Sequence, residues 1–113
     1  MRKKKRFIIQ GEALNLAFFH VGLPVVDGEK YAITDKDILT FTIGRKNRKP
    51  VLTKTYPGEI VNEGDDNFFV YLTAEDTRKL PCLRYQMQLT VDVEGIGEEI
   101  YTLVKYELEV VAK

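Results

Sequence analysis

The chain has 113 residues, of which 44% are apolar, and its aromatic residues are six Phe and six Tyr with no Trp. This length and composition suit one domain with a single core, residues 1–113, and argue against disorder. Seventeen basic and seventeen acidic residues leave a formal net charge of zero, so no overall field attracts nucleic acid or a membrane surface.

The first six residues are mostly basic and are expected to form a flexible arm. The apolar run that follows, Phe7 to Ile9, is too short for a signal peptide. No stretch approaches the roughly 20 apolar residues of a transmembrane helix. The sequence therefore predicts neither export nor membrane insertion.

The dominant period along the chain is two, which is typical of strands with one buried and one exposed face. Turn residues separate these runs about every ten positions, as in a sandwich or barrel. A short edge strand is expected over residues 51–55. The predicted inward positions in the earlier strands are Leu14, Leu16 and Phe18, then Leu39, Phe41 and Ile43, then Phe68, Val70 and Leu72.

Two long strands are predicted near the C-terminus, joined as an antiparallel hairpin through Gly95 and Gly97, which can take positive φ angles. The only helix is predicted from Thr73 to Leu80, where Thr73 and Asp76 resemble a capping box. The inward positions are Tyr85, Met87, Leu89, Val91 and Val93 in the first strand, and Ile100, Val104, Tyr106, Leu108 and Val110 in the second.

The sequence thus predicts an all-β, Ig-like antiparallel two-sheet β-sandwich of seven to eight strands with one short helix. The core is expected to contain Leu16, Phe18, Phe41, Ile43, Val70, Leu72, Met87, Leu89, Val91, Tyr106 and Leu108.

No group of residues indicates an enzyme, a metal site or a cofactor. His20 is the only histidine and Cys82 the only cysteine, so the chain cannot supply a zinc site built from Cys and His. His20 is interpreted as an ordinary strand-end residue. Cys82, between Pro81 and Leu83, is interpreted as an unreactive thiol in the core, and a reducing compartment is the simpler expectation.

Two acidic loops and two basic clusters have alternative interpretations. The loops, Glu63 to Asn67 and Asp35 with Asp37, could offer oxygen ligands to calcium but lack a dedicated calcium motif, so solvated turns are expected. The clusters, residues 2–6 and 45–49, could contact phosphates. Neither is interleaved with aromatic residues, so no nucleic-acid partner is predicted, and the second cluster is expected at a hairpin tip.

Phe69 and Tyr71 alternate with inward-facing residues and should point away from the core. Large aromatic rings on a face that would otherwise contact solvent indicate that another surface covers them. Either another part of the chain covers them or they form a protein interface.

Several short motifs, taken in order, resemble the N-terminal domain family of phage baseplate upper proteins and related Ig-like tail modules. They are Gly11-Glu12 before an alternating strand, residues 27–34 ahead of residues 38–43, residues 50–54, residues 72–77 with Leu80-Pro81, and residues 85–89. Cys82-Leu83 departs from this pattern, since the family often has a glycine after the Leu-Pro step.

This resemblance implies a non-enzymatic structural or assembly module of a phage or prophage tail. Such a module would bind baseplate or tail subunits or itself, and would be found in the virion or in the bacterial cytoplasm before assembly. It implies no small-molecule substrate and no cofactor. The alternative is a carbohydrate- or surface-binding β-sandwich that uses Phe69, Tyr71 and Tyr101 as aromatic platforms.

Overall fold

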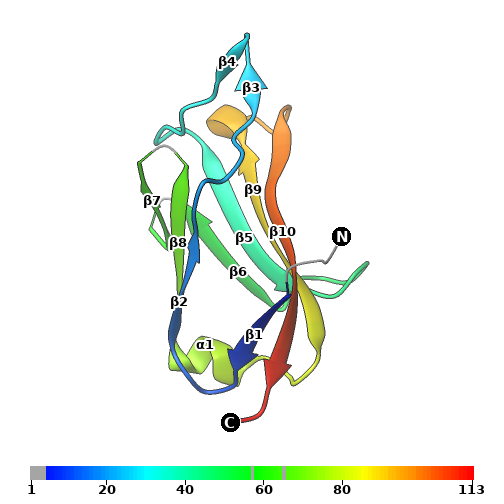
Figure 1. The fold of residues 1–113 in the computed structure, drawn as a ribbon. Coiled ribbons are helices and arrows are strands. Elements are labelled where there is room, and N and C mark those ends of the chain that lie inside the picture. The colour runs from blue at the N-terminus through cyan, green and yellow to red at the C-terminus, as the bar shows by residue number, and fades with distance from the viewer. Residues whose placement is uncertain (1–4, 57, 65) are drawn as a thin grey trace.

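The computed structural model describes residues 5–56, 58–64 and 66–113, and it confirms the all-β, sandwich-like class. Two sheets face each other, a small hairpin projects from one end, and a short helix closes the other end (Figure 1). The larger sheet has the order β1 (Lys5–Ile9), β10 (Ile100–Val111), β9 (Arg84–Asp92), β5 (Ile38–Gly44) and β6 (Leu52–Tyr56). The smaller sheet has the order β2 (Leu14–Phe18), β8 (Asn67–Leu72) and β7 (Ile60–Glu63). The projecting hairpin consists of β3 (Val25–Val26) and β4 (Glu29–Lys30).

The N-terminal segment differs from the prediction of a flexible arm over residues 1–6. Lys5 and Arg6 belong to β1, which pairs in parallel with β10, so the sandwich is not wholly antiparallel. Residues 1–4 lie outside the described residues. The Arg6 guanidinium lies 5.1 Å from the centre of the Phe18 ring and 5.4 Å from that of Tyr106, and it donates to the Ala17 carbonyl at 3.2 Å. These contacts hold Arg6 across the edge of the sandwich, where a cation can stack on aromatic faces.

Ten strands are present among the described residues, against the seven to eight predicted. Six of them coincide with strands that the sequence located by residue, and the four that it did not locate are β1, β3, β4 and β7, each of five residues or fewer. Strands this short contain too few alternations to give a clear period-two pattern.

The hairpin of β9 and β10 is confirmed, but one residue of β10 faces the opposite way from the prediction. A bulge between Thr102 and Val104 shifts the register, so Tyr101 pairs with Val91 on the core side and Ile100 is directed outward. An inserted residue reverses the faces of every residue before it, because side chains alternate.

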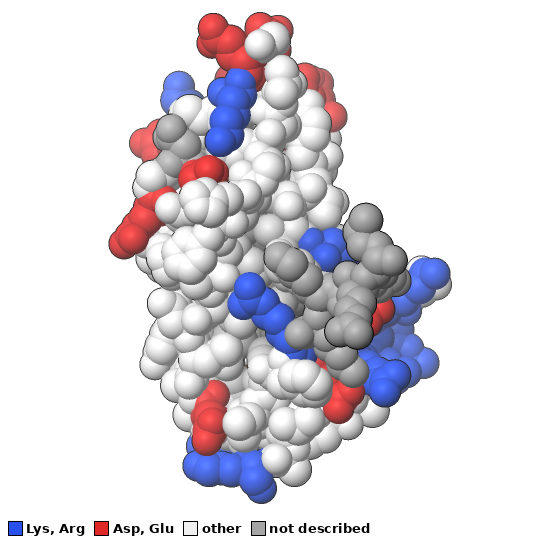
Figure 2. All heavy atoms as spheres, in the orientation of Figure 1, with Lys and Arg blue, Asp and Glu red and all other residues white. Residues whose placement is uncertain are grey.

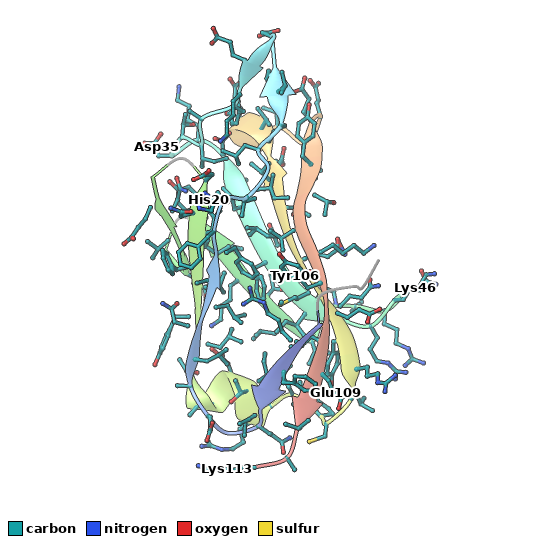
Figure 3. All side chains as sticks on the ribbon, viewed as in Figure 1. His20, Asp35, Lys46, Tyr106, Glu109 and Lys113 are labelled. Atoms are coloured by element: carbon teal, nitrogen blue, oxygen red, sulfur yellow. The ribbon has the colours of Figure 1, made fainter. Side chains whose placement is uncertain are left out.

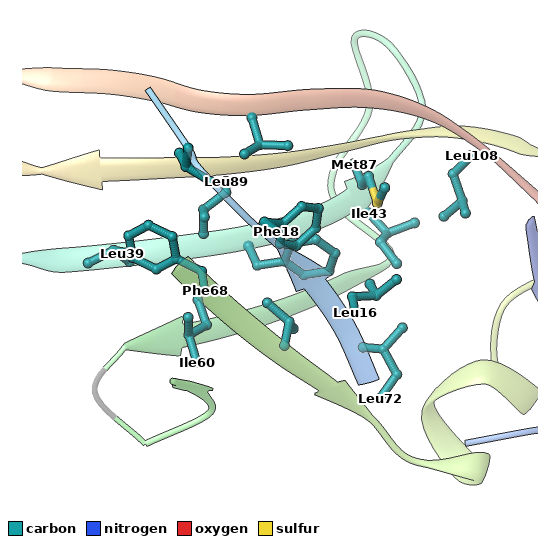
Figure 4. Close-up of a cluster of buried hydrophobic side chains, with 14 of the residues drawn as sticks. Leu16, Phe18, Leu39, Ile43, Ile60, Phe68, Leu72, Met87, Leu89 and Leu108 are labelled. Carbon is teal, nitrogen blue, oxygen red and sulfur yellow. The ribbon is translucent and has the colours of Figure 1, made fainter. Parts of the chain in front are cut away.

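The core lies between the two sheets (Figure 4). Every residue predicted for the core belongs to this buried cluster except Tyr106, which packs against it. Most of these side chains are fully buried, while Tyr106 is half-buried and packs against the others. The ring centres of Phe18 and Phe41 are 6.1 Å apart, so aromatic side chains of both sheets meet in the middle. This cross-sheet packing is the main source of stability in a chain without a disulfide.

The helix α1 (Ala74–Arg78) begins as predicted. The Thr73 hydroxyl accepts from the Asp76 backbone N–H at 3.0 Å, and the Asp76 carboxylate accepts from the Thr73 backbone N–H at 2.9 Å, which completes a capping box. The buried Thr77 hydroxyl accepts from the Gly11 N–H at 3.0 Å and lies 2.9 Å from the Glu12 carbonyl, to which it can donate. Thr77 therefore attaches α1 to the turn between β1 and β2.

Asp37 is buried and ties together the loops at the other end of the sandwich, which contradicts its interpretation as part of a solvated turn. Its carboxylate accepts from the Tyr31 hydroxyl at 2.6 Å, the Thr34 backbone N–H at 2.7 Å and the Glu94 backbone N–H at 2.8 Å. Burial acts to raise the pKa of Asp37, but these hydrogen bonds outweigh it and hold the pKa below its usual value. Burial, followed by the hydrogen bond to Asp37, raises the pKa of Tyr31 to about 12.

Candidate functional site

The outer face of the smaller sheet is the main candidate site, and Phe69 and Tyr71 lie on it as predicted. Along β8, their neighbours Phe68, Val70 and Leu72 are fully buried, whereas Tyr71 is 55% exposed and Phe69 is half-buried. The strand alternation alone produces this division, because successive side chains leave opposite faces of the sheet.

Neighbouring strands add further apolar side chains to this face. Ala17 of β2 and Val61 of β7 lie opposite Phe69 in the register, and the Phe19 ring meets the Phe69 ring edge-on at 5.7 Å between centres. Phe19 is 61% exposed and Val61 is 51% exposed. Within the described part of the chain, these exposures show that no segment covers the face. We call Phe19, Val61, Phe69 and Tyr71 the aromatic face.

An open hollow of about 850 Å³ adjoins this face. Asn15, Val61, Phe69, Tyr71 and Thr73 line it from the smaller sheet and its end, while Lys54, Gly58, Glu59 and Glu63 complete the lining. The hollow therefore combines exposed rings with amide, carboxylate and ammonium groups, a composition that suits recognition of another surface better than a closed small-molecule pocket.

Lys54 extends from β6 across the open edge of the sandwich to α1. Its ammonium lies 2.9 Å from the Asp76 carboxylate and 3.6 Å from that of Glu59. The hydrogen bond to Asp76 raises the pKa of Lys54 despite its burial. Burial acts to raise the pKa of Asp76, but the hydrogen bonds from Lys54 and Thr73 outweigh it and lower that pKa. Lys54 thus stays charged at neutral pH, and its charge is neutralised by carboxylates beside the aromatic face.

His20 and Tyr101 lie apart from this hollow. The His20 side chain is almost fully exposed beyond the end of β2 and lies 3.8 Å from the Asp66 carboxylate (Figure 3). Tyr101 is half-buried against the core from β10, so it does not provide a platform beside Tyr71.

The residues considered for calcium do not converge. Asp66 lies 3.6 Å from the Lys30 ammonium, and the Asn67 side-chain oxygen accepts from the His20 backbone N–H, while Asp65 lies outside the described residues. Over residues 5–56, 58–64 and 66–113, no three His, Cys, Asp or Glu side chains are grouped to hold a metal ion.

The interpretation of Cys82 as a core thiol is wrong, because the side chain is exposed. It lies in the irregular link between α1 and β9, where its apolar neighbours Leu80 and Tyr85 take the buried positions. The thiol lies 3.6 Å from the Gln10 side-chain oxygen, to which it donates a weak hydrogen bond. Flanking residue types did not indicate exposure, because this link has no strand alternation.

Residues 45–49, four of which are basic, form the tip of the β5–β6 hairpin, as predicted, and all five are exposed. Sequence reasoning missed Asn15, Lys54, Glu59 and Val61 at the candidate site. These residues line the site because of the order of the strands in the sheets and the contact between Lys54 and α1. An alternating sequence pattern predicts neither the strand order nor that contact.

No helix in the described ranges is long and apolar enough to cross a membrane. Comparison with protein-family models finds no match for this chain, and comparison with curated proteins finds none either.

Proposed function

We propose that this protein is a non-enzymatic assembly module that works by binding other proteins through its aromatic face. The observation that carries the proposal is the exposure of Phe19, Val61 and Tyr71 beside Phe69 on one side of a small sheet. Aromatic rings that could each bury on the order of 150–250 Å² are costly to leave in water. A rim of polar and charged side chains around such rings is typical of protein interfaces.

The proposed setting is the tail of a phage or prophage, with a baseplate or tail subunit as the partner. Its support is the order of short motifs that resemble phage baseplate modules, together with the sandwich fold. Catalysis is not part of the proposal, because Lys54, a lining residue of the hollow whose pKa is shifted, is paired with Asp76 on α1.

The test is a double variant, Phe69→Ser with Tyr71→Ser. We expect the wild-type chain to associate at concentrations of tens to hundreds of micromolar, in a reaction that salt does not weaken, because apolar contacts are not screened. The double variant should lose this association and keep its unfolding temperature within a few degrees. Sedimentation velocity and thermal unfolding measure the two effects.

A matched control is Ile96→Ser with Ile100→Ser, since both side chains are exposed but lie outside the aromatic face. It should keep the salt-insensitive association of the wild type. The proposal fails if the wild type stays monomeric at all concentrations and its neighbouring genes encode no tail proteins. Loss of folding in the double variant would instead show that the rings stabilise the monomer.

Carbohydrate binding is a second candidate, favoured by the position of Tyr71 beside Asn15, Lys54 and Glu59 in one hollow. Sugar rings stack on exposed aromatic faces while polar side chains bond their hydroxyls. Binding on a glycan array that Tyr71→Ala abolishes would support this function, and absence of any binding would remove it.

A further inference from the structure

The charges of this protein form two separate surface patches, although the formal net charge is zero. Acidic side chains gather at the tip that carries β3 and β4, and basic ones gather at the lower right of the same view, where Lys46 lies (Figures 2 and 3). We call these the acidic tip, made of Asp27, Glu29, Glu94 and Glu99, and the basic patch, made of Arg45, Lys46, Arg48, Arg84 and Lys105.

The acidic tip surrounds a hollow of about 510 Å³ between the β3–β4 hairpin and the turn after β9. Its four carboxylates are accompanied by one cation in the lining, Lys30, which lies 3.6 Å from the Asp66 carboxylate. The four acidic side chains are exposed. The tip therefore presents a negative potential that its own lysine does not neutralise.

The basic patch consists of two adjoining hollows of about 350 and 340 Å³ that share Arg45, Lys46, Arg48 and Gln86. Among the described residues that line them, Glu107 is the single carboxylate. Arg84 lies 3.4 Å from Glu109. Arg45, Lys46 and Arg48 belong to an exposed hairpin tip, and Lys105 is exposed on β10. Guanidinium groups in such a setting bind carboxylates well, because their paired N–H donors match the two carboxylate oxygens.

The shape of the acidic tip suits insertion into a hollow. The β3–β4 hairpin pairs with no other described strand and projects from the sandwich (Figure 1). Asp27 and Gly28 have φ angles of 53° and 80°, which form the tight turn at its end. This gives a narrow projection that carries carboxylates and the exposed Val25.

We propose that the acidic tip of one copy binds the basic patch of the next, so that copies associate head to tail. The two surfaces are complementary in charge and lie on different parts of the chain. Such a contact leaves one tip and one patch free in every dimer, so it continues into a ring or a filament. This inference rests on the charges and not on the aromatic face.

A second copy fits the basic patch better than a nucleic acid does. Tyr85 is the one aromatic residue in its lining over the part of the chain that the structure describes. Its ring is buried and its hydroxyl donates to the Pro81 carbonyl, so it offers no face on which a base can stack.

The experiment uses charge reversals at exposed positions. Arg45→Glu, Lys46→Glu and Arg48→Glu together make the patch negative, because only Arg84 and Lys105 of its five cations remain. Glu29→Lys, Glu94→Lys and Glu99→Lys together make the tip positive, because only Asp27 of its four carboxylates remains. We expect the mass of the wild type to rise above 13.0 kDa at low salt. Its association constant should fall roughly tenfold or more at ~0.5 M salt, where charges are screened within about 4 Å. Either triple reversal should abolish this salt-sensitive association in sedimentation velocity.

The decisive variant carries both triple reversals in one chain, which exchanges the signs of the two surfaces and returns the formal net charge to zero. Its salt-sensitive association should return. The control combines Glu29→Lys, Glu94→Lys and Glu99→Lys with Arg78→Glu, Lys79→Glu and Lys113→Glu, three exposed cations outside the patch. It has the same net charge but two basic surfaces, and it should show no salt-sensitive association.

The proposal is overturned if the wild type shows no salt-sensitive association, or if the control recovers as well as the charge exchange does. It is also overturned if a labelled DNA duplex binds the wild type at ~0.15 M salt and Lys46→Glu with Arg48→Glu removes that binding. The Phe69→Ser, Tyr71→Ser variant separates the two proposals, because it should lose the salt-insensitive association and keep the salt-sensitive one. If the wild type shows only a salt-insensitive association and this variant loses it, the head-to-tail contact is wrong and the assembly function stands.

Discussion

Replacing Asp37 by Asn tests whether one buried carboxylate holds the loops at the hairpin end together. The substitution keeps the shape of the side chain and replaces one oxygen acceptor by a donating NH₂ group. In the structure, one carboxylate oxygen accepts from Tyr31 and Glu94, and the other accepts from the Thr34 N–H. Whichever way the amide is oriented, at least one backbone N–H faces a donor.

The magnitude follows from the bonds that are lost. A buried donor left without a partner costs about 1–3 kcal/mol, and hydrogen bonds to a charged acceptor contribute about 1.5–3 kcal/mol each. Glu94 also has a positive φ of 56°, a strained conformation that its bond to Asp37 helps to hold. We therefore expect Asp37→Asn to lower the free energy of unfolding by roughly 2–4 kcal/mol at pH 7.

Urea unfolding of the wild type and the variant, followed by circular dichroism, gives this difference. It should depend on pH, because the folded-state pKa of Asp37 lies below its usual value near 3.8. The stabilisation is then complete at pH values above the unfolded-state pKa. It declines as the pH falls through the folded-state pKa, where protonated Asp37 resembles Asn.

Asp35→Asn is the matched control, because Asp35 is exposed two residues earlier in the same loop. It should change the unfolding free energy by less than about 0.5 kcal/mol. A cost of the same size for Asp35→Asn and Asp37→Asn would refute the reasoning. So would a cost for Asp37→Asn that does not diminish in acid.

Three further predictions concern packing, the helix attachment and the thiol. Leu89→Ala should lower the unfolding free energy by about 2–5 kcal/mol in urea unfolding, since Leu89 is fully buried between the sheets, and a loss below 1 kcal/mol would contradict its placement. Thr77→Val should cost about 1–3 kcal/mol because the Gly11 N–H loses its acceptor, whereas Thr77→Ser should cost less; equal losses in both would mean that the hydroxyl is not the anchor. Cys82 should react with a thiol reagent in the native state at a rate near that of the urea-unfolded chain, and strong protection would contradict its exposure.

The sequence by itself determined the strand class, most of the core and the local caps. Strict alternation placed Leu89 and Phe68 inward and Tyr71 outward, because side chains of a strand leave alternate faces whichever strands it pairs with. The capping box at Thr73 could also be predicted from the sequence, since all of its groups lie within four residues. The direction of Phe69 and Tyr71, on which the assembly proposal depends, needed no tertiary information.

Only the tertiary structure decided what depends on pairing between distant segments. Arg6 belongs to a strand because β10 lies beside it, and Ile100 faces outward because a bulge at Thr102 shifts the register. Asp37 is buried because the loop after β9 places the Glu94 N–H against its carboxylate, although the two residues are 57 positions apart in the sequence. The acidic tip and the basic patch likewise consist of residues from separate segments of the chain. The formal net charge of zero gives no indication that these two charged surfaces exist. Composition and alternation are local properties, whereas these features arise from contacts whose partners the local sequence does not specify.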